Sequence, residues 1–355
     1  MAKNKNPNQI NDLQPENIND NLDLSQVVDK IIEEKEKHSN TIKEAIKEIE
    51  KRFGSESIMF LNKIPDAKTE TIHSGSYMLD KALGIKGFPK GKIIEIYGPE
   101  SCGKTTLALH TIAEVQKQGG VAAFVDAEHS IDPVYAQNIG VDVDKLILSQ
   151  PDSGEQALDI VDILSKTGKI DLIVLDSVAA LVPEAELNGE MTDQQIGAQA
   201  RLMSKALRKI TGHLNKNKTT IIFINQLREK VGVIFGNPET TPGGRALKFY
   251  SSIRIEVRKG PAIEENKDIV GSEIKFKVVK NKLAAPYKTG QSELFYSKGI
   301  DKIGELIDLG TEKGIIDKKG AWYSHEGSNV AQGKKKMKEY LLQNNNLMNQ
   351  ILSLL

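Results

Sequence analysis

The sequence predicts an α/β protein: a core with a mostly parallel sheet, an N-terminal helical arm and a small α+β C-terminal domain. Three observations carry this expectation. From residue 90 onward short apolar runs alternate with helical stretches, an isolated amphipathic pattern precedes them, and beyond Asp301 the chain becomes helical and lysine-rich. Strands that alternate with helices form mainly parallel sheets with both faces covered.

The composition is that of a folded protein without export or membrane signals. Of 355 residues, 48 are basic and 48 acidic, which excludes a generally basic, histone-like protein but leaves room for a local basic groove. Hydrophobic residues make up 39% and charged residues 27%, as in globular domains. No apolar run approaches the roughly 20 residues of a membrane helix, and the Asn- and Lys-rich start has no signal core. A single cysteine, Cys102, suits a reducing cytosol, so we expect a cytoplasmic protein without membrane contact.

The N-terminal region predicts an extension followed by one helix. Residues 1–22 hold seven asparagines and few large side chains, so we expect a disordered extension over residues 1–30. A helical pattern starts at about Leu24, Thr41 with Glu44 resembles a capping box, and Gly54 stands where a helix C-cap is expected. Within this N-terminal segment, residues 31–65, an apolar stripe must pack on its own domain or on a neighbouring subunit. The residues alone leave both alternatives open; the stripe consists of Ile42, Ile46, Ile49 and Phe53.

The core is expected over residues 66–301, with a small domain over residues 302–355. Apolar runs predict buried strands, and a helix follows the first of them at residues 104–118. The expected strands are residues 93–97, 121–125, 170–175 and 220–224. Two later segments, 252–258 and 274–280, alternate apolar with charged residues, which predicts half-exposed, antiparallel strands at an edge of the sheet.

Residues 98–105 match the Walker A nucleotide-binding pattern in full, between a predicted buried strand and a predicted helix. In such a loop, backbone N–H groups and the helix N-terminus bind phosphate oxygens, Lys104 reaches the outer phosphates, and Thr105 binds Mg²⁺. The sequence therefore predicts a P-loop NTPase core that binds a nucleoside triphosphate with Mg²⁺. The expected ATP-binding residues of this loop are Gly98, Pro99, Glu100, Ser101, Cys102, Gly103, Lys104, Thr105 and Thr106.

Cys102 lies at the predicted helix N-terminus beside Lys104. Both the helix dipole and the lysine favour a thiolate and would lower the pKa of the thiol, which makes Cys102 a candidate redox-sensitive residue. The alternative is a thiol that packing shields, because burial opposes ionisation.

Three polar residues stand where predicted strands end. Asp176 follows an apolar strand in the Walker B arrangement, so we expect it beside the Mg²⁺ that Thr105 binds. Glu128 follows residues 121–125 at the ligand edge of a parallel sheet, where a carboxylate can activate the attacking water; a surface glutamate without a role is the alternative. Gln226 follows the last strand, where it can sense the γ-phosphate and pass that signal to the next segment.

Two glycine-punctuated segments are candidates for binding single-stranded nucleic acid. Residues 227–245 combine apolar tips with flanking cations, which suits bases and phosphates respectively. Residues 188–201 are rich in glycine and glutamine. The expected DNA-binding residues are Gly189, Met191, Ile196, Gly197, Arg201, Arg228, Lys230, Ile234, Phe235, Gly243, Gly244 and Arg245.

Several long sequence motifs distinguish this chain from other P-loop proteins. They are GPESCGKTT at 98–106, VDAEH at 125–129, SQPDSGEQA at 149–157, LDSVAAL at 175–181, FINQ at 223–226, FGNPETT at 235–241 and VVKNKLAAP at 278–286. Together they resemble the bacterial RecA recombinase family over residues 53–332. The resemblance implies a DNA-dependent ATPase that forms filaments on single-stranded DNA and exchanges strands with homologous duplex DNA in repair. It also implies further copies of the chain, a LexA-type repressor of the SOS response and recombination mediators as partners.

The resemblance implies residue roles that spacing does not reveal. The implied catalytic residues are Glu128, Lys104, Gln226, Lys280 and Lys282, the last two reaching the ATP of a neighbouring subunit. The residues alone would assign Lys280 and Lys282 to a solvated strand face. Asp132 and Tyr135 would contact adenine, with Tyr296 nearby.

The resemblance also covers assembly and DNA. Lys248, Phe249 and Arg254 match a subunit contact segment. The helix at residues 41–53 matches a neighbour-docking helix, and residues 188–197 and 227–241 match two DNA-binding loops.

Two features depart from the family's pattern. Residues 1–30 precede the helix, and no carboxylate side chain follows Glu339, where the family commonly has an acidic tail. We therefore expect duplex DNA binding to depend less steeply on salt and Mg²⁺ than in relatives with such a tail.

Two rival functions remain. A hexameric helicase or rotary-type ATPase shares the core, but lacks residues 235–241 and 278–282 in this form. A non-hydrolysing interaction scaffold is opposed by Lys104, Glu128 and Asp176, which are all present.

Overall fold

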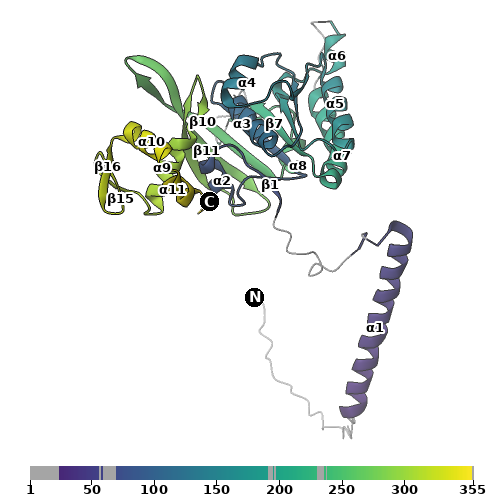
Figure 1. Ribbon diagram of the computed structural model, residues 1–355. Helices are drawn as coiled ribbons and strands as arrows, with labels where there is room; N and C mark the ends of the chain where they lie inside the picture. Colours follow the sequence, from purple (N-terminus) through teal and green to yellow (C-terminus); the bar gives the residue numbers. More distant parts are fainter. Residues whose placement is uncertain are drawn as a thin grey trace, which may run out of the picture. The chain divides into compact units, whose positions relative to one another are not determined.

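The computed structural model describes residues 24–55, 57–58, 69–190, 195, 197–229, 236 and 238–353 (Figure 1). Contacts divide the chain into two compact units, residues 1–68 and residues 69–355. Among the helices of the described ranges, none combines the length and the apolarity that crossing a membrane requires.

The first unit contains α1, Leu24–Phe53. The Thr41 hydroxyl donates to the Lys37 carbonyl at 2.9 Å, so Thr41 lies inside the helix and the predicted capping box is wrong. The helix also takes up residues 24–30, which we expected in the disordered extension; residues 1–23 lie outside the described residues. Gly54 has φ 96° and donates its N–H to the Glu50 carbonyl at 2.9 Å, which ends the helix where predicted.

The second unit is built on a nine-stranded sheet with the order β13-β12-β11-β10-β3-β7-β6-β4-β5. Strands β3 to β7 are parallel and include the four predicted from apolar runs, and all residues of β3, β4 and β6 are buried. The parallel strands are β3 (Ile93–Gly98), β4 (Ala122–Asp126), β5 (Ile147–Ser149), β6 (Leu172–Asp176) and β7 (Thr220–Gln226). The predicted α/β fold class is confirmed.

The sheet continues into an antiparallel part. β10 (Ile253–Glu265) and β11 (Asp268–Asn281) pair antiparallel, as predicted. Their predicted edge position is wrong, because β10 also pairs in parallel with β3, and β12 (Thr289–Phe295) and β13 (Gly299–Ile300) lie beyond β11. The sequence of β12, TGQSELF, contains glycine and few β-branched residues, so it does not predict a strand.

Helices cover both faces of the sheet (Figure 1). One face packs against α2 (Tyr77–Leu83), α3 (Lys104–Lys117) and α4 (Pro133–Ile139), and the other against α5 (Gly154–Lys166), α7 (Ala198–Asn217) and α8 (Ala246–Tyr250). Side chains alternate along β3, so that Ile94 and Ile96 join the first core and Ile93 joins the second. Shorter elements are β1 (Thr71–Ile72), β2 (Phe88–Pro89), the 3₁₀ turn η2 (Val178–Ala180), α6 (Glu184–Leu187), β8 (Arg228–Glu229) and β9 (Glu239–Thr240).

The C-terminal elements form their own small core. Three helices and a three-stranded antiparallel sheet bury Leu306, Tyr323, Met337 and Leu341 together. They are α9 (Lys302–Glu312), β14 (Asp317–Lys319), β15 (Trp322–His325), β16 (Ser328–Gln332), α10 (Lys334–Gln343) and α11 (Asn345–Leu352). Within the lysine-rich run, Lys334 pairs with Glu293 at 3.2 Å and with Asp308 at 3.0 Å, whereas Lys335 and Lys336 are exposed.

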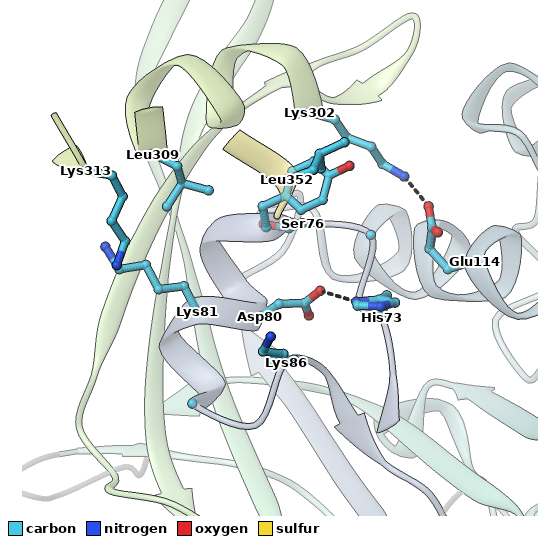
Figure 2. Close-up of a pocket in the computed structure, with 13 residues that line it drawn as sticks. His73, Ser76, Asp80, Lys81, Lys86, Glu114, Lys302, Leu309, Lys313 and Leu352 are labelled. Atoms are coloured by element: carbon cyan, nitrogen blue, oxygen red, sulfur yellow. Dashed lines mark hydrogen bonds and ion pairs between the residues drawn. The ribbon is translucent and has the colours of Figure 1, made fainter. Parts of the chain in front are cut away.

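Glu305 of α9 ties the C-terminal elements to α2. Its buried carboxylate accepts hydrogen bonds from the Ser76 hydroxyl and, at 2.7 Å, from the Tyr77 N–H. Burial raises the pKa of Glu305 to about 7. A cavity of about 580 Å³ lies beside this contact, and its wall holds the ion pairs His73–Asp80 and Lys302–Glu114 (Figure 2). The helices α2, α3 and α9 thus all contribute residues to the wall of this cavity.

Candidate nucleotide and DNA sites

The P-loop connects β3 to α3 and requires glycine at its first position. A Cβ on Gly98 would lie 2.1 Å from the Val257 carbonyl oxygen, so β10 leaves no room for a side chain. Gly103 has φ 91° at the N-cap of α3, a conformation that glycine adopts without strain. The loop is thus folded tightly against β10, with the free N–H groups of the α3 N-terminus at its mouth.

Lys104 lies over this loop. Its side chain is buried and its Nζ donates to the Pro99 carbonyl, at the mouth where phosphate oxygens would compete for it. Cys102 lies beneath, 1% exposed, with its Sγ 3.8 Å from the Lys104 Nζ. Burial raises the pKa of the Cys102 thiol and Lys104 only partly opposes this, which is opposite to the lowered pKa that the redox-sensitive alternative requires. Of the two alternatives for Cys102, the structure favours the shielded thiol.

Thr105 and Asp176 meet at the ends of α3 and β6. The Thr105 hydroxyl donates to Asp176 Oδ2 at 2.5 Å, and burial raises the pKa of Asp176 to about 6. The described residues hold no group of three or more His, Cys, Asp or Glu side chains that could bind a metal. A hydroxyl and a carboxylate nevertheless suit Mg²⁺, which takes few protein oxygens and completes its shell with phosphates and water.

Glu128 is held by residues from two neighbouring strands. Its Oε1 accepts hydrogen bonds from the Ser177 hydroxyl, next to the end of β6, and from Gln226 Nε2 at 2.9 Å. Gln226 ends β7 directly opposite Gly98 in the register of β3 and β7. Side chains from three parallel strand ends therefore gather at the P-loop, and the Glu128 Oε2 is left without a hydrogen bond within the described chain. Sequence reasoning did not find Ser177, although it directly follows the Walker B aspartate.

The residues expected near adenine are only partly brought together. The Tyr135 and Thr106 hydroxyls are 3.0 Å apart, so Tyr135 lies against the P-loop helix. The Asp132 carboxylate caps α4 instead, accepting from the Val134 N–H at 2.9 Å. Tyr296 follows β12 and is half exposed, and within the described ranges no hydrogen bond joins it to Tyr135 or Thr106.

Lys280 and Lys282 gather at the end of α8. The Lys280 Nζ donates to the Lys248 carbonyl at 2.6 Å, and the Lys282 Nζ to the Phe249 carbonyl at 3.4 Å. Burial and the charge of Lys282 lower the pKa of Lys280. The Phe249 ring beside them is 69% exposed. Lys280 of β11 pairs with Arg254 of β10, which in turn pairs with Glu95 of β3. Glu95 precedes Gly98 by three residues, about 10 Å along the strand, so Lys280 lies away from the P-loop of its own chain.

Arg254, expected at a subunit contact, is engaged within its own chain. Its Nε donates to Oε2 of Glu95, a carboxylate buried completely in β3, and its guanidinium stands 4.6 Å from the Tyr97 ring centroid. Asn225 donates to the other oxygen of Glu95 at 3.1 Å. Sequence reasoning overlooked Glu95, although a single carboxylate inside the apolar run IIEIY signals a buried charge that needs a partner.

The described parts of the two DNA-loop candidates flank α7 and β8–β9. Gly189 precedes the first gap, Gly197 caps α7 with φ 73°, and Arg201 is exposed in its first turn. Arg228 and Arg245 are exposed, and Gly243 and Gly244 have φ 82° and 77°. Met191, Ile196, Lys230, Ile234 and Phe235 lie outside the described residues.

Gln199 joins the two candidates. It lies in the first turn of α7, and its side-chain Oε1 accepts from the Gly243 N–H at 3.1 Å. Nothing in the sequence distinguished Gln199 from other polar residues at the start of a helix.

Comparison with known proteins gives one consistent result. The family model for the RecA N-terminal domain matches residues 40–301, and the model for the RecA C-terminal domain matches residues 304–354. Protein RecA of Mycoplasmopsis pulmonis (strain UAB CTIP) is 66% identical over 310 residues, 87% of this chain and 91% of its own. Protein RecA of Mesomycoplasma hyopneumoniae (strain 7448) is 67% identical over 310 residues, 87% and 92% of the two chains. Protein RecA of Bacillus subtilis (strain 168) is 59% identical over 304 residues, 86% and 87%.

Proposed function

This chain belongs to the RecA family of DNA-dependent ATPases that recombine and repair DNA, and from that premise we propose which of its residues bind ATP, hydrolyse it and contact DNA. The ATP phosphates would lie in residues 98–105, at the N-terminus of α3. There the Lys104 Nζ would exchange the Pro99 carbonyl for phosphate oxygens, a stronger, charge-assisted interaction. Tyr135, packed on Thr106, would border the base.

Mg²⁺ would be held by Thr105 and Asp176, whose oxygens already touch. When bound, the ion neutralises charge on the phosphate oxygens. The ion would then supply a counter-charge to the ionised Asp176 carboxylate. In the chain itself, Lys104 does not offset the desolvation of this buried carboxylate.

Glu128 would act as the general base. With Oε1 held by Ser177 and Gln226, Oε2 is free to accept a proton from the water whose oxygen attacks the γ-phosphorus, which releases ADP and phosphate. Gln226 would leave Glu128 to hydrogen-bond the γ-phosphate when ATP binds. Because β8 follows directly, that movement would be passed to the segment at residues 227–245.

The chain assembles into filaments as members of its family do. We assign the subunit contact to Phe249 and Lys248, with Lys280 and Lys282 reaching the ATP of the next subunit. The distance of these lysines from their own P-loop and the exposure of Phe249 support this assignment. Arg254 would hold this surface in shape through Glu95 rather than contact the neighbour. The apolar stripe of α1, which includes the exposed Ile42 and Phe53, would dock on that neighbour.

DNA would bind to residues 188–201 and 227–245, with Arg201, Arg228 and Arg245 facing phosphates. A LexA-type repressor and recombination mediators are further partners that we propose from the family alone, and the cytoplasm is the location where this DNA chemistry would occur. We also propose domain limits at residues 66–301 and 302–355, supported by the separate core of the C-terminal elements.

The observation that carries the assignment is the contact of Glu128 with Gln226 beside the Thr105–Asp176 pair. Its test is ATP hydrolysis with and without single-stranded DNA, together with strand exchange, on the parent and on Gln226→Ala. We expect Gln226→Ala to bind ATP but to lose stimulation by DNA. Separation of a duplex without strand exchange would instead favour a helicase.

A further inference from the structure

Gln199 joins three segments of main chain through one side-chain amide. Its Nε2 donates to the carbonyls of Val178 at 2.9 Å and Leu181 at 3.0 Å, and its Oε1 accepts from the Gly243 N–H at 3.1 Å. Only the NH₂ group can serve two carbonyls and only the oxygen can serve an N–H, so the partners fix the orientation of the amide. Two of these bonds end on the turn at residues 177–181 and the third ends at Gly243, so the side chain connects its own helix with two other segments.

The three parts are those to which the proposed function assigns ATP hydrolysis and DNA binding. Gln199 lies near the end of the first DNA segment, residues 188–201, and Gly243 lies near the end of the second, residues 227–245. Val178 and Leu181 belong to the turn that starts at Ser177, the residue whose hydroxyl donates to Glu128. A continuous series of contacts therefore runs from both DNA segments to the carboxylate proposed to activate water.

Close packing makes this junction stiff. A Cβ on Gly243 would lie 2.8 Å from Val178 Cγ1, and a Cβ on Gly244 would lie 2.7 Å from the Cβ of Ala200. The end of the second DNA segment therefore rests directly on the turn after β6 and on the first turn of α7. In so dense a contact, a shift of either DNA segment must displace the turn that carries Ser177.

We propose that Gln199 is a positioning residue that transmits DNA occupancy of both segments to Glu128 through residues 177–181. This inference rests on the proposed roles of Glu128 and of the two DNA segments. It describes a route separate from Gln226, which is linked by the chain itself to the second segment only. Gln226 and Ser177 hold the same oxygen of Glu128, so the two routes end on one carboxylate.

The test is the ratio of kcat for ATP hydrolysis with and without single-stranded DNA in Gln199→Met, which keeps the length of the side chain but removes the amide. We expect this ratio to fall about tenfold, a usual size for coupling between two sites. The KM for ATP should change less than about threefold, since the ATP contacts are assigned to other residues. The stimulated rates of parent and variant are both measured at saturating single-stranded DNA, so that a change in DNA affinity does not enter the ratio.

Gln116→Met is a matched control. Gln116 is also half buried and exchanges hydrogen bonds of 2.9 Å in both directions with the main chain of Asp142, near the end of α3 away from the P-loop. It should keep the parent ratio. Gln199→Glu retains an oxygen that accepts from the Gly243 N–H, but places a second carboxylate oxygen against the carbonyls of Val178 and Leu181, which repel it. It should therefore behave like Gln199→Met, and it replaces that variant in the test if Gln199→Met does not fold.

Three results would overturn the proposal. Equal loss of the rates with and without DNA in Gln199→Met would show a structural role only. An unchanged ratio would remove the inference while the proposed function stands. We expect the double variant Ser177→Ala/Gln199→Met to lose no more stimulation by DNA than the stronger of the two single variants. If the fold-losses of stimulation in the single variants multiply in the double variant, the two residues act independently and a common route is excluded. If the parent itself lacked stimulation by DNA, the proposed function would fall as well.

Discussion

Replacing Arg254 should destabilise the core and not only the filament. Glu95 lies in the central strand β3 with no exposed surface, and its carboxylate has two partners, the Arg254 Nε and the Asn225 Nδ2. Arg254→Met keeps most of the aliphatic stem but removes the guanidinium. The carboxylate then keeps one neutral amide donor at 3.1 Å and no directly bonded counter-charge, with Lys280 as a more distant cation.

The expected cost follows from this geometry. Breaking a buried ion pair by removing one partner costs about 3–5 kcal/mol, because the remaining charge stays desolvated. Loss of the guanidinium from the Tyr97 ring, 4.6 Å away, adds about 0.5–1 kcal/mol. At about 2–4 °C per kcal/mol for a domain of this size class, the first contribution alone lowers Tm by about 6–20 °C.

The assay is thermal and urea unfolding of the full chain at two protein concentrations, so that the contribution of assembly to stability is measured separately. Arg208→Met, at an exposed arginine of α7, is the control and should lie within about 0.5 kcal/mol of the parent. Glu95→Gln/Arg254→Met should recover most of the loss, since no buried charge remains. A free energy of unfolding for Arg254→Met within 1 kcal/mol of the parent, with filament assembly lost, would refute this reasoning and restore Arg254 to the subunit contact.

Three further predictions concern single side chains. Glu128→Gln should bind ATP and assemble normally but lower kcat by at least about 100-fold, measured by nucleotide binding and phosphate release; turnover within a few-fold of the parent would remove Glu128 as the base. Cys102 should react slowly with a small thiol reagent in the folded protein, as followed by mass, and Cys102→Ser should keep the ATPase activity; rapid modification that blocks ATP binding would contradict the shielded thiol. The raised pKa of Glu305, about 7 in the folded chain against 4.5 as the ordinary value, means that the folded state binds more protons between these limits. Stability should therefore fall as pH rises from about 4.5 to 7, and Glu305→Gln should flatten that slope in urea titrations, whereas an equal slope in both proteins would exclude Glu305 as its source.

The parts of the molecule that local sequence determines could be predicted. A strand, a glycine-punctuated loop and a helix carry their own signals, so the P-loop and the four buried strands were expected within a few residues of their observed limits. Asp176 and Gln226 could be expected at one edge because parallel strands end on the same side of a sheet.

What depends on distant parts of the chain could not be predicted. Whether Cys102 is ionised depends on how deeply other elements bury it, and the residues around it in sequence pointed the opposite way. Glu95, the partner of Arg254, lies 159 positions earlier in the chain, in β3. No sequence pattern predicts that β3 pairs with β10. Gln199 acquires its three partners only when the turn after β6, the start of α7 and Gly243 are packed together.

The pairing of the sheet also indicates where foreign sequence could be inserted. β3 pairs with β7 through six consecutive residue pairs without interruption, so one added residue in either strand would turn its polar end to the opposite face. The hairpin of β10 and β11 already contains register shifts, between Lys259 and Ala262 and between Ile263 and Glu264, and its tip turns at Asn266 and Lys267 with φ 52° and 77°. These irregularities can accommodate changes in length before such changes reach the strand ends beside the P-loop. A peptide epitope or a small fluorescent domain spliced between Asn266 and Lys267 should therefore report on the filament while the geometry around Gly98 is kept.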